Sequence, residues 1–184
     1  MNVIASTGQL RAGLLRWTLL TVPTMLLLGL LSGTLSGSGA GNVWFATLVK
    51  PAAYPPASTF GIVWPILYVL MGIALAVIFA ARGAPGRGPA VVVFVVQAAL
   101  NLAWSPVFFA MHDILAALVV IALLDLAVLA TILLFYRVRP IAALLLVPYL
   151  LWIGFATYLN WELHVLNPVT ESVEVSGAVQ RIEF

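Results

Sequence analysis

Five long apolar stretches, separated by short polar segments, set the pattern of the chain. They cover residues 14–35, 60–81, 90–111, 114–135 and 141–160. Each is close to the roughly 20 residues with which an α-helix crosses the hydrocarbon core of a bilayer. The pattern therefore predicts an all-α membrane protein, a five-transmembrane-helix bundle that occupies residues 14–166 as one domain. In this prediction residues 1–13 are an N-terminal tail and residues 167–184 a polar C-terminal tail.

Prolines and aromatic residues dominate the segment between the first two stretches. Pro51, Pro55 and Pro56 each fix a backbone angle and bias the preceding residue away from the helical region, so we expect a stiff, extended segment. Trp44 and Tyr54 give it side chains that can pack onto the bundle. The sequence thus predicts a Pro/aromatic lid loop between helices one and two.

Small residues mark the end of the first stretch. Gly29, Gly33, Gly37 and Gly41 recur every four residues. This spacing lets another helix approach closely, either within the bundle or in a dimer. The alternative interpretation is a helix end that frays into a glycine-rich loop.

The third stretch carries amides and aromatic rings on one face. Gln97, Asn101, Trp104 and Phe108 follow helical spacing and form a single stripe. Amides are costly in a membrane unless they find partners, so this stripe is expected to point into the bundle. There it can line a ligand cavity, or the amides can simply join helices.

A similar stripe runs along the fifth stretch, through Tyr149, Trp152, Ala156 and Asn160. Ala156 leaves a gap among larger side chains, with room for a flat ligand. An apolar pocket with a few convergent polar groups is the usual form of a small-molecule site. Together with one face of the second stretch and the lid, the predicted ligand-binding residues are Trp44, Tyr54, Trp64, Tyr68, Gln97, Asn101, Trp104, Phe108, Tyr149, Trp152, Ala156 and Asn160.

Asp125 is a charged residue inside an apolar stretch. It lies about 11 residues from Ile114, hence about 16 Å deep, near the bilayer midplane. Asn101 and Trp152 fall at a similar depth. An intramembrane carboxylate is a functional candidate, and the alternative is a protonated, hydrogen-bonded aspartic acid within the packing.

Composition and charge agree with a membrane location. Apolar residues make up 64% of the chain and charged residues only 8%, far from the balance of soluble domains. Basic residues gather on one side of a five-helix topology, which predicts a cytoplasmic N-terminus and favours a bacterial inner membrane. These residues are Arg11, Arg16, Arg82, Arg87, Arg137 and Arg139. Cysteine is absent, and His112 and His164 are too far apart in sequence to suggest a metal site.

Several of these motifs occur together in one family. The chain resembles the tryptophan-rich sensory protein family, also called the translocator protein or peripheral-type benzodiazepine receptor family. The matching residues are Lys50-Pro51 with Pro55-Pro56, Val63-Trp64 with Leu67-Tyr68 and Met71, Gln97, Asn101, Trp104, Phe108-Phe109, Pro148-Tyr149, Trp152, Phe155-Ala156 and Leu159-Asn160. They cover the chain roughly from Trp44 to Asn167 in the family's order and spacing.

The resemblance implies an integral membrane receptor or sensor that binds tetrapyrroles. Its expected ligands are protoporphyrin IX, haem and related flat apolar molecules, with no intrinsic cofactor, no nucleic acid partner and a homodimeric assembly in the bilayer. Two alternatives stay open. One is a light- and oxygen-dependent enzyme that degrades protoporphyrin, in which tryptophans matching Trp64 and Trp152 are implicated. The other is a porphyrin transporter with Asp125 as a proton-linked switch.

Two features limit what the resemblance implies. The sterol-recognition pattern of animal members needs a basic residue after a tyrosine, but Tyr158 is followed by Leu-Asn-Trp-Glu-Leu-His. Some bacterial relatives are assigned to the outer membrane, whereas the basic residues of this chain favour the inner one.

Overall fold

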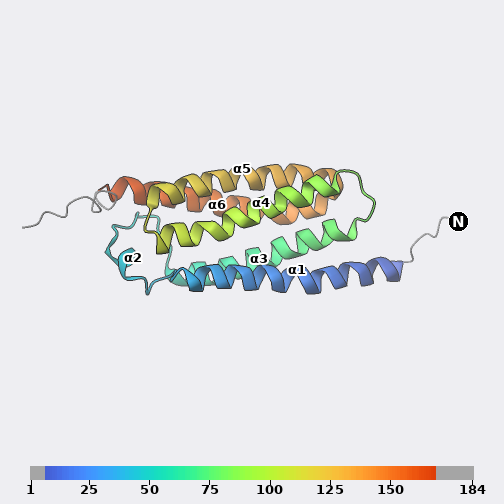
Figure 1. Cartoon of the computed structure of the whole chain (residues 1–184), viewed down its shortest axis with the longest axis horizontal. Coiled ribbons are helices and arrows are strands. Elements are labelled where there is room, and N and C mark those ends of the chain that lie inside the picture. Colours follow the sequence, from blue (N-terminus) through green and yellow to red (C-terminus); the bar gives the residue numbers. More distant parts are fainter. Residues whose placement is uncertain (1–6, 169–184) are drawn as a thin grey trace, which may run out of the picture.

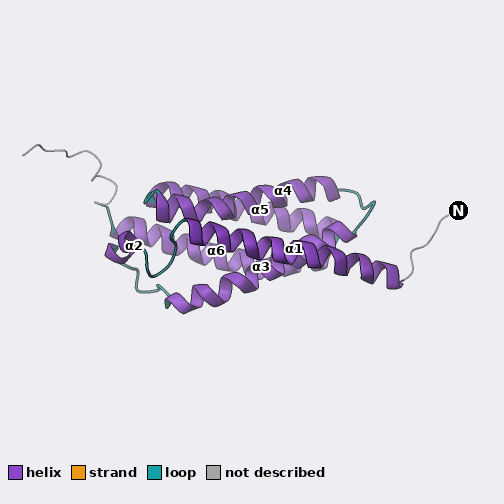
Figure 2. Ribbon diagram, turned by 60° about the horizontal axis from the view of Figure 1, so that its bottom comes forward, coloured by secondary structure: helices purple, strands orange, loops and turns teal. Residues whose placement is uncertain are grey.

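The computed structural model describes residues 7–168 and consists of helices joined by loops (Figures 1 and 2). Its elements are α1 (Thr7–Leu35), α2 (Val43–Thr47), α3 (Ala57–Ala80), α4 (Arg87–Ser105), the π-helical turn η1 (Pro106–Ala110), α5 (Ile114–Val138) and α6 (Pro140–Leu166). Five of the helices are long and apolar enough to cross a membrane when η1 is counted with α4. The predicted five-helix bundle is confirmed, and the protein is a multi-pass membrane protein.

Two helices run past their predicted apolar stretches. α1 begins at Thr7, within the segment assigned to the N-terminal tail, and α6 continues through Glu162 and His164 to Leu166. Hydropathy marks the part of a helix that lies in the bilayer, whereas a helix also extends into water where nothing breaks it. Residues 1–6 and 169–184, which include most of the predicted C-terminal tail, lie outside the described residues.

The helices pack in a closed order around the bundle. α1 packs on α3, α3 on α6, α6 on α5 and α5 on α4. The short α2 and the loop after it lie at one end, and the N-terminus of α1 lies at the other (Figure 1). The second end also holds the α3–α4 and α5–α6 connections, with Arg82, Arg87, Arg137 and Arg139. We call these the lid end and the basic end.

Apolar side chains occupy both the inside and the outside of the bundle. Met71, Tyr149 and Ile153 are fully buried between helices. Leu19 and Leu151 are exposed to 67% and 70%, as expected where the surroundings are lipid rather than water.

The glycines at the end of the first apolar stretch divide between the two expected roles, close helix packing and a loop after the helix. A Cβ atom at Gly29 would overlap the ring of Tyr68 in α3, so Gly29 allows close helix packing inside the bundle. Gly37, by contrast, has a φ of 63° and follows the helix end, where it forms a turn. The same contact between α1 and α3 recurs deeper, where a Cβ at Gly72 would lie 2.7 Å from the Cα of Val22.

Pro106 changes the course of the third membrane helix. It has no N–H, so the carbonyl of Leu102 loses its partner within the helix. The hydroxyl of Ser32 in α1 donates to that carbonyl at 2.7 Å. Beyond Pro106 the chain forms the π turn, in which the N–H of Met111 donates to the Pro106 carbonyl at 2.9 Å. Because a π turn holds an extra residue, both Phe108 and Phe109 become buried at the lid end.

Candidate ligand site

The lid consists of α2 and the loop over residues 48–56. The loop is not uniformly extended as predicted, because the Tyr54 N–H donates to the Pro51 carbonyl at 3.0 Å and closes a turn. Phe45 of α2 faces inward and is buried. Lys50 lies 4.5 Å from the centre of the Phe45 ring, and its ammonium group donates to the carbonyls of Phe45 and Leu48. The lysine thus holds the two parts of the lid together.

Two asparagines fasten the lid to the bundle. Asn42 caps α2 by accepting from the Phe45 N–H at 2.8 Å, and its amide donates to the Phe109 carbonyl at 3.3 Å. Asn167, just beyond α6, accepts from the Val49 N–H at 2.8 Å and donates to the Val49 carbonyl at 3.0 Å. The lid is therefore hydrogen-bonded to the bundle at its start, through Asn42, and in its middle, at Val49.

Aromatic rings fill the space beneath the lid. Trp104 stacks on Phe108 with ring centres 5.0 Å apart, and Phe45 meets Phe108 edge-on at 5.9 Å. Trp44 packs against Phe108 and stacks on the exposed His112 at 4.6 Å. Trp44 and Phe45, both in α2, thus contact the same ring, that of Phe108.

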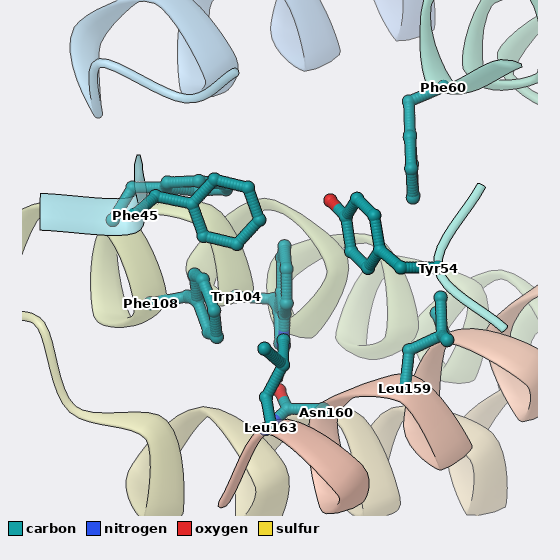
Figure 3. Close-up of a pocket in the computed structure, with 10 residues that line it drawn as sticks. Phe45, Tyr54, Phe60, Trp104, Phe108, Leu159, Asn160 and Leu163 are labelled. Atoms are coloured by element: carbon teal, nitrogen blue, oxygen red, sulfur yellow. The ribbon is translucent and has the colours of Figure 1, made fainter. Parts of the chain in front are cut away.

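A small pocket of about 40 Å³ lies among these rings. Phe45 and Tyr54 approach it from the lid, whereas Leu159, Asn160 and Leu163 come from α6, with Trp104 between them (Figure 3). The full lining is Phe45, Tyr54, Phe60, Trp104, Phe108, Phe109, Ala156, Leu159, Asn160 and Leu163. We call it the lid pocket.

The floor of the lid pocket is fixed by an amide. The indole N–H of Trp104 donates to the side-chain oxygen of Asn160 at 3.0 Å, and the Asn160 amide donates to the Ile114 carbonyl at 3.0 Å. Asn160 thereby ties α4, α5 and α6 together while it lines the pocket. Both expected roles of an intramembrane amide, joining helices and lining a cavity, meet in this one residue.

A second hydrogen-bond chain lies deeper in the bundle. The Tyr68 hydroxyl donates to the Asn101 side-chain oxygen at 3.0 Å, and the Asn101 amide donates to the Tyr149 hydroxyl at 2.9 Å. This chain joins α3, α4 and α6. Asn101 acts here as a link between helices and does not line the lid pocket.

Gln97 and Asp125 lie apart from the lid pocket. Gln97 is fully buried, and neither atom of its amide has a hydrogen-bond partner among residues 7–168. Asp125 accepts from the Thr157 hydroxyl at 2.7 Å, across the seam between α5 and α6. The common depth predicted for Asp125 and Asn101 does not bring them into one hydrogen-bonded cluster, since Asp125 pairs with Thr157 whereas Asn101 pairs with Tyr68 and Tyr149.

The two tryptophans singled out by the resemblance also lie outside the lid pocket. Trp64 stacks on Tyr68 with ring centres 5.5 Å apart. Trp152 meets Phe60 edge-on at 5.7 Å and lines an open groove of about 440 Å³ between α3 and α6. The groove is lined by Val63, Ile66, Leu67, Leu70, Pro148, Leu151, Trp152 and Phe155.

Tyr54 supplies a hydroxyl at the wall of the lid pocket. Burial raises the pKa of Tyr54 to about 12, because the phenolate would lose water. The group is therefore a neutral hydrogen-bond donor and acceptor at physiological pH.

Comparison with known proteins identifies the family of the chain. The family model described as the TspO/MBR family matches residues 20–166, which include all the candidate site residues. This chain belongs to the TspO/MBR family. It is similar to the tryptophan-rich protein TspO of Chlorobaculum tepidum, at 46% identity over 68% of this chain and 80% of that protein. It is also similar to the human translocator protein, at 38% identity over 73% and 80%, and to the tryptophan-rich sensory protein of Cereibacter sphaeroides, at 40% over 67% and 77%.

In this TspO/MBR protein the structure divides the predicted ligand-binding residues into three groups. Tyr54, Trp104, Phe108, Ala156 and Asn160 line the lid pocket, and Trp44 supports it through Phe108. A second group, Trp64, Tyr68, Asn101 and Tyr149, belongs to the stacked and hydrogen-bonded interior, with Gln97 buried on the same helix as Asn101. The third is Trp152 in the groove.

The sequence interpretation left out half of the lid pocket of this TspO/MBR protein. Phe45, Phe60, Phe109, Leu159 and Leu163 line it but were not among the candidates. Phe45 adjoins Trp44, and the choice between them depends on the rotation of α2, which was not predicted. The burial of Phe109 depends on the π turn, for which Pro106 was the available signal.

Proposed function

We propose that this protein is a membrane receptor or sensor that binds tetrapyrroles and related flat, largely apolar molecules under its lid. The main observation in support of the proposal is the lid pocket, where stacked aromatic rings surround a small number of polar side-chain groups. Stacked rings suit a flat aromatic ligand, and the Asn160 amide and Tyr54 hydroxyl provide orienting hydrogen bonds. Membership of the TspO/MBR family, with relatives named as sensory and translocator proteins, supports the same class of function.

The lid must move for such a ligand to bind. A pocket of about 40 Å³ is far below the roughly 300–1,000 Å³ of drug-sized ligand sites. Its roof comes from Phe45 and Tyr54 of the lid, whereas its floor comes from α4, η1 and α6. Lifting the lid would therefore enlarge the pocket without separating the membrane helices. The ligand then replaces the roof as the partner of Trp104 and Phe108.

Titration with protoporphyrin IX in the dark, followed by tryptophan fluorescence, tests this proposal. The critical variant is Ala156→Leu, which adds volume at the pocket wall. It should weaken binding about tenfold, because overpacking of the pocket costs about one to two kcal/mol of binding free energy. Ala99→Leu adds the same volume on an exposed face of α4 and should bind like the wild type. Equal affinities for the two variants would refute a site under the lid.

Illumination of the same samples separates receptor from enzyme. With a receptor, illumination changes the porphyrin absorption spectrum in the same way with and without protein. A degrading enzyme instead produces a new, protein-dependent absorption band. If such a band appeared and Trp64→Phe or Trp152→Phe abolished it, the enzymatic alternative would replace the receptor.

A further inference from the structure

Two helix connections meet at the basic end of the bundle, and both carry arginines. A Cβ atom at Gly86, which precedes α4, would lie 3.9 Å from the Cγ2 atom of Val138 at the end of α5. Arg87 follows Gly86 in the sequence, and Val138 lies between Arg137 and Arg139. Segments with arginines from the α3–α4 and α5–α6 connections therefore lie side by side, although they are far apart in the sequence.

No carboxylate of the described residues balances these charges. Arg82, Arg137 and Arg139 are exposed, and Arg87 is half-buried. The acidic side chains among residues 7–168 lie elsewhere, at the lid end or midway along α5. They are Asp113, Asp125 and Glu162. The basic end thus presents a cluster of four like charges that must find its counter-charge outside this part of the chain.

An aromatic ring positions one of the four arginines. The guanidinium carbon of Arg87 lies 5.9 Å from the centre of the Phe79 ring, and that ring packs on Trp17 of α1 at 4.7 Å. Among residues 7–168 the guanidinium has no hydrogen-bond or ion-pair partner. Its N–H groups form a planar fork that suits two oxygens of a phosphate. Phe79 therefore holds in place a donor set whose matching acceptor is an anion.

The cluster lies where the membrane-spanning helices end. α3 ends at Ala80 and α5 at Val138, and Tyr136 is 64% exposed, as is common for aromatic residues at a membrane interface. Anionic phospholipids present their phosphates at this level and attract nearby arginines. The positive-inside rule accounts for basic residues in these connections, but not for their convergence or for the ring that holds Arg87.

We propose that the basic end binds the headgroup of an anionic phospholipid, whose phosphate bridges Arg87 and Arg139. Arg87 donates to the phosphate from the α3–α4 connection. Arg139 donates from the α5–α6 connection with the N–H groups that remain after its Nη1 atom donates to the Val138 carbonyl at 3.1 Å. The headgroup thereby joins two helix pairs. The site lies at the opposite end of the bundle from the lid pocket and does not depend on the receptor function proposed for it.

Titration of the full chain in detergent with phosphatidylglycerol, followed by native mass spectrometry, tests this site. Phosphatidylglycerol should bind more tightly than the neutral phosphatidylcholine. Arg87→Gln and Arg139→Gln should each weaken its binding about fivefold, equivalent to about 1 kcal/mol for one arginine near an anionic lipid. Arg11→Gln is the matched control, because it removes the same charge from an exposed position of α1 at the same end, and it should bind like the wild type. Phosphatidylcholine binding should be the same in all variants, which checks that they are folded.

A charge-conserving variant separates a defined site from diffuse attraction. Arg87→Lys keeps the positive charge but lacks the planar fork of donors. It should weaken phosphatidylglycerol binding about threefold, the effect of one net hydrogen bond of about 0.7 kcal/mol. Diffuse attraction depends on charge alone, and would leave the lysine variant at the wild-type affinity.

Three results would overturn the proposal. Equal losses in Arg11→Gln and Arg87→Gln, or wild-type affinity in Arg87→Lys, would mean that the end attracts anionic lipid without a site. Equal binding of the two lipids by the wild type would mean that the headgroup charge is not recognised. Displacement of phosphatidylglycerol by inorganic phosphate at the same concentration would mean that the arginines hold a free anion. None of these readouts involves porphyrin, so a failure to bind porphyrin under the lid would leave them unaffected.

Discussion

The site geometry makes a specific prediction for a lid that loses its hydrogen bonds to Asn167. Asn167→Ala removes the two hydrogen bonds that join this side chain to the N–H and carbonyl of Val49. A third bond, to the Leu163 carbonyl at 2.8 Å, stays within the end of α6 and does not hold the lid. At about 1 kcal/mol net for each lid bond, closure weakens by about 2 kcal/mol. The equilibrium constant for lid opening should therefore rise about thirtyfold.

Amide hydrogen exchange measures this change directly. In the wild type, the Val49 N–H is the lid amide that donates to the Asn167 side chain, at 2.8 Å, and it loses this acceptor in the variant. Peptides that cover residues 44–54 should exchange faster in Asn167→Ala, by up to the same factor. Exchange in the middle of α5, which the substitution does not touch, provides the internal control. Protoporphyrin IX should also associate faster, because the binding-competent open state is more populated.

The reasoning fails if the variant keeps its wild-type helix content but the lid exchanges at the wild-type rate. In that case the Asn167 side chain does not hold the lid, and other contacts, such as the hydrogen bond from the Asn42 amide to the Phe109 carbonyl, keep it closed. Asn167→Asp distinguishes geometry from packing, because a carboxylate has nearly the same size but cannot donate to the Val49 carbonyl. Asn167→Asp should therefore show a large part of the increase in lid hydrogen exchange that Asn167→Ala shows.

Three further predictions concern the helix contacts and the lid. Ser32→Ala leaves the Leu102 carbonyl freed by Pro106 without its donor, and should lower the free energy of unfolding by about 1–2 kcal/mol, measured by thermal unfolding in detergent. Gly72→Ala forces α1 away from α3, since the new methyl group would lie 2.7 Å from a backbone atom, and should lower the melting temperature; an unchanged value would contradict the packing. For Tyr54 the folded pKa of about 12 lies above the unfolded value of about 10, so lid stability is full below pH 10 and falls as pH rises toward 12; ultraviolet titration against Tyr54→Phe should show a phenol that ionises near 12.

Hydropathy predicted the bundle well because crossing a bilayer imposes a length and a composition on each helix. It could not predict that α1 begins at Thr7 or that α6 ends at Leu166, since those ends lie beyond the apolar stretches. The α2 helix was also unpredicted. Its five residues are held by the Asn42 cap and by packing of Phe45, which are tertiary effects and leave little periodicity to detect.

Helical spacing predicted the site residues only in part. Residues three apart on a helix differ by about 60° in direction, so one stripe can reach from the interior to a neighbouring seam. Tyr149 and Trp152 illustrate this: Tyr149 is fully buried, whereas Trp152 lines the groove. Spacing placed Ala156 and Asn160 on one face, and both line the lid pocket. Which of the inward residues bind a ligand, and which bond to one another, depends on side-chain partners from other helices.

The π turn after Pro106 has a consequence for how this protein can change over time. One residue distinguishes a π turn from the α-helical turn it replaces, so a single insertion or deletion near Val107 can create or remove it. The π turn absorbs the extra residue, so such an event would change which side chains the turn presents while the chain before and after it kept its register. The composition of the pocket wall could therefore be altered in one genetic step, without redesign of the membrane-spanning interfaces that hold the bundle together.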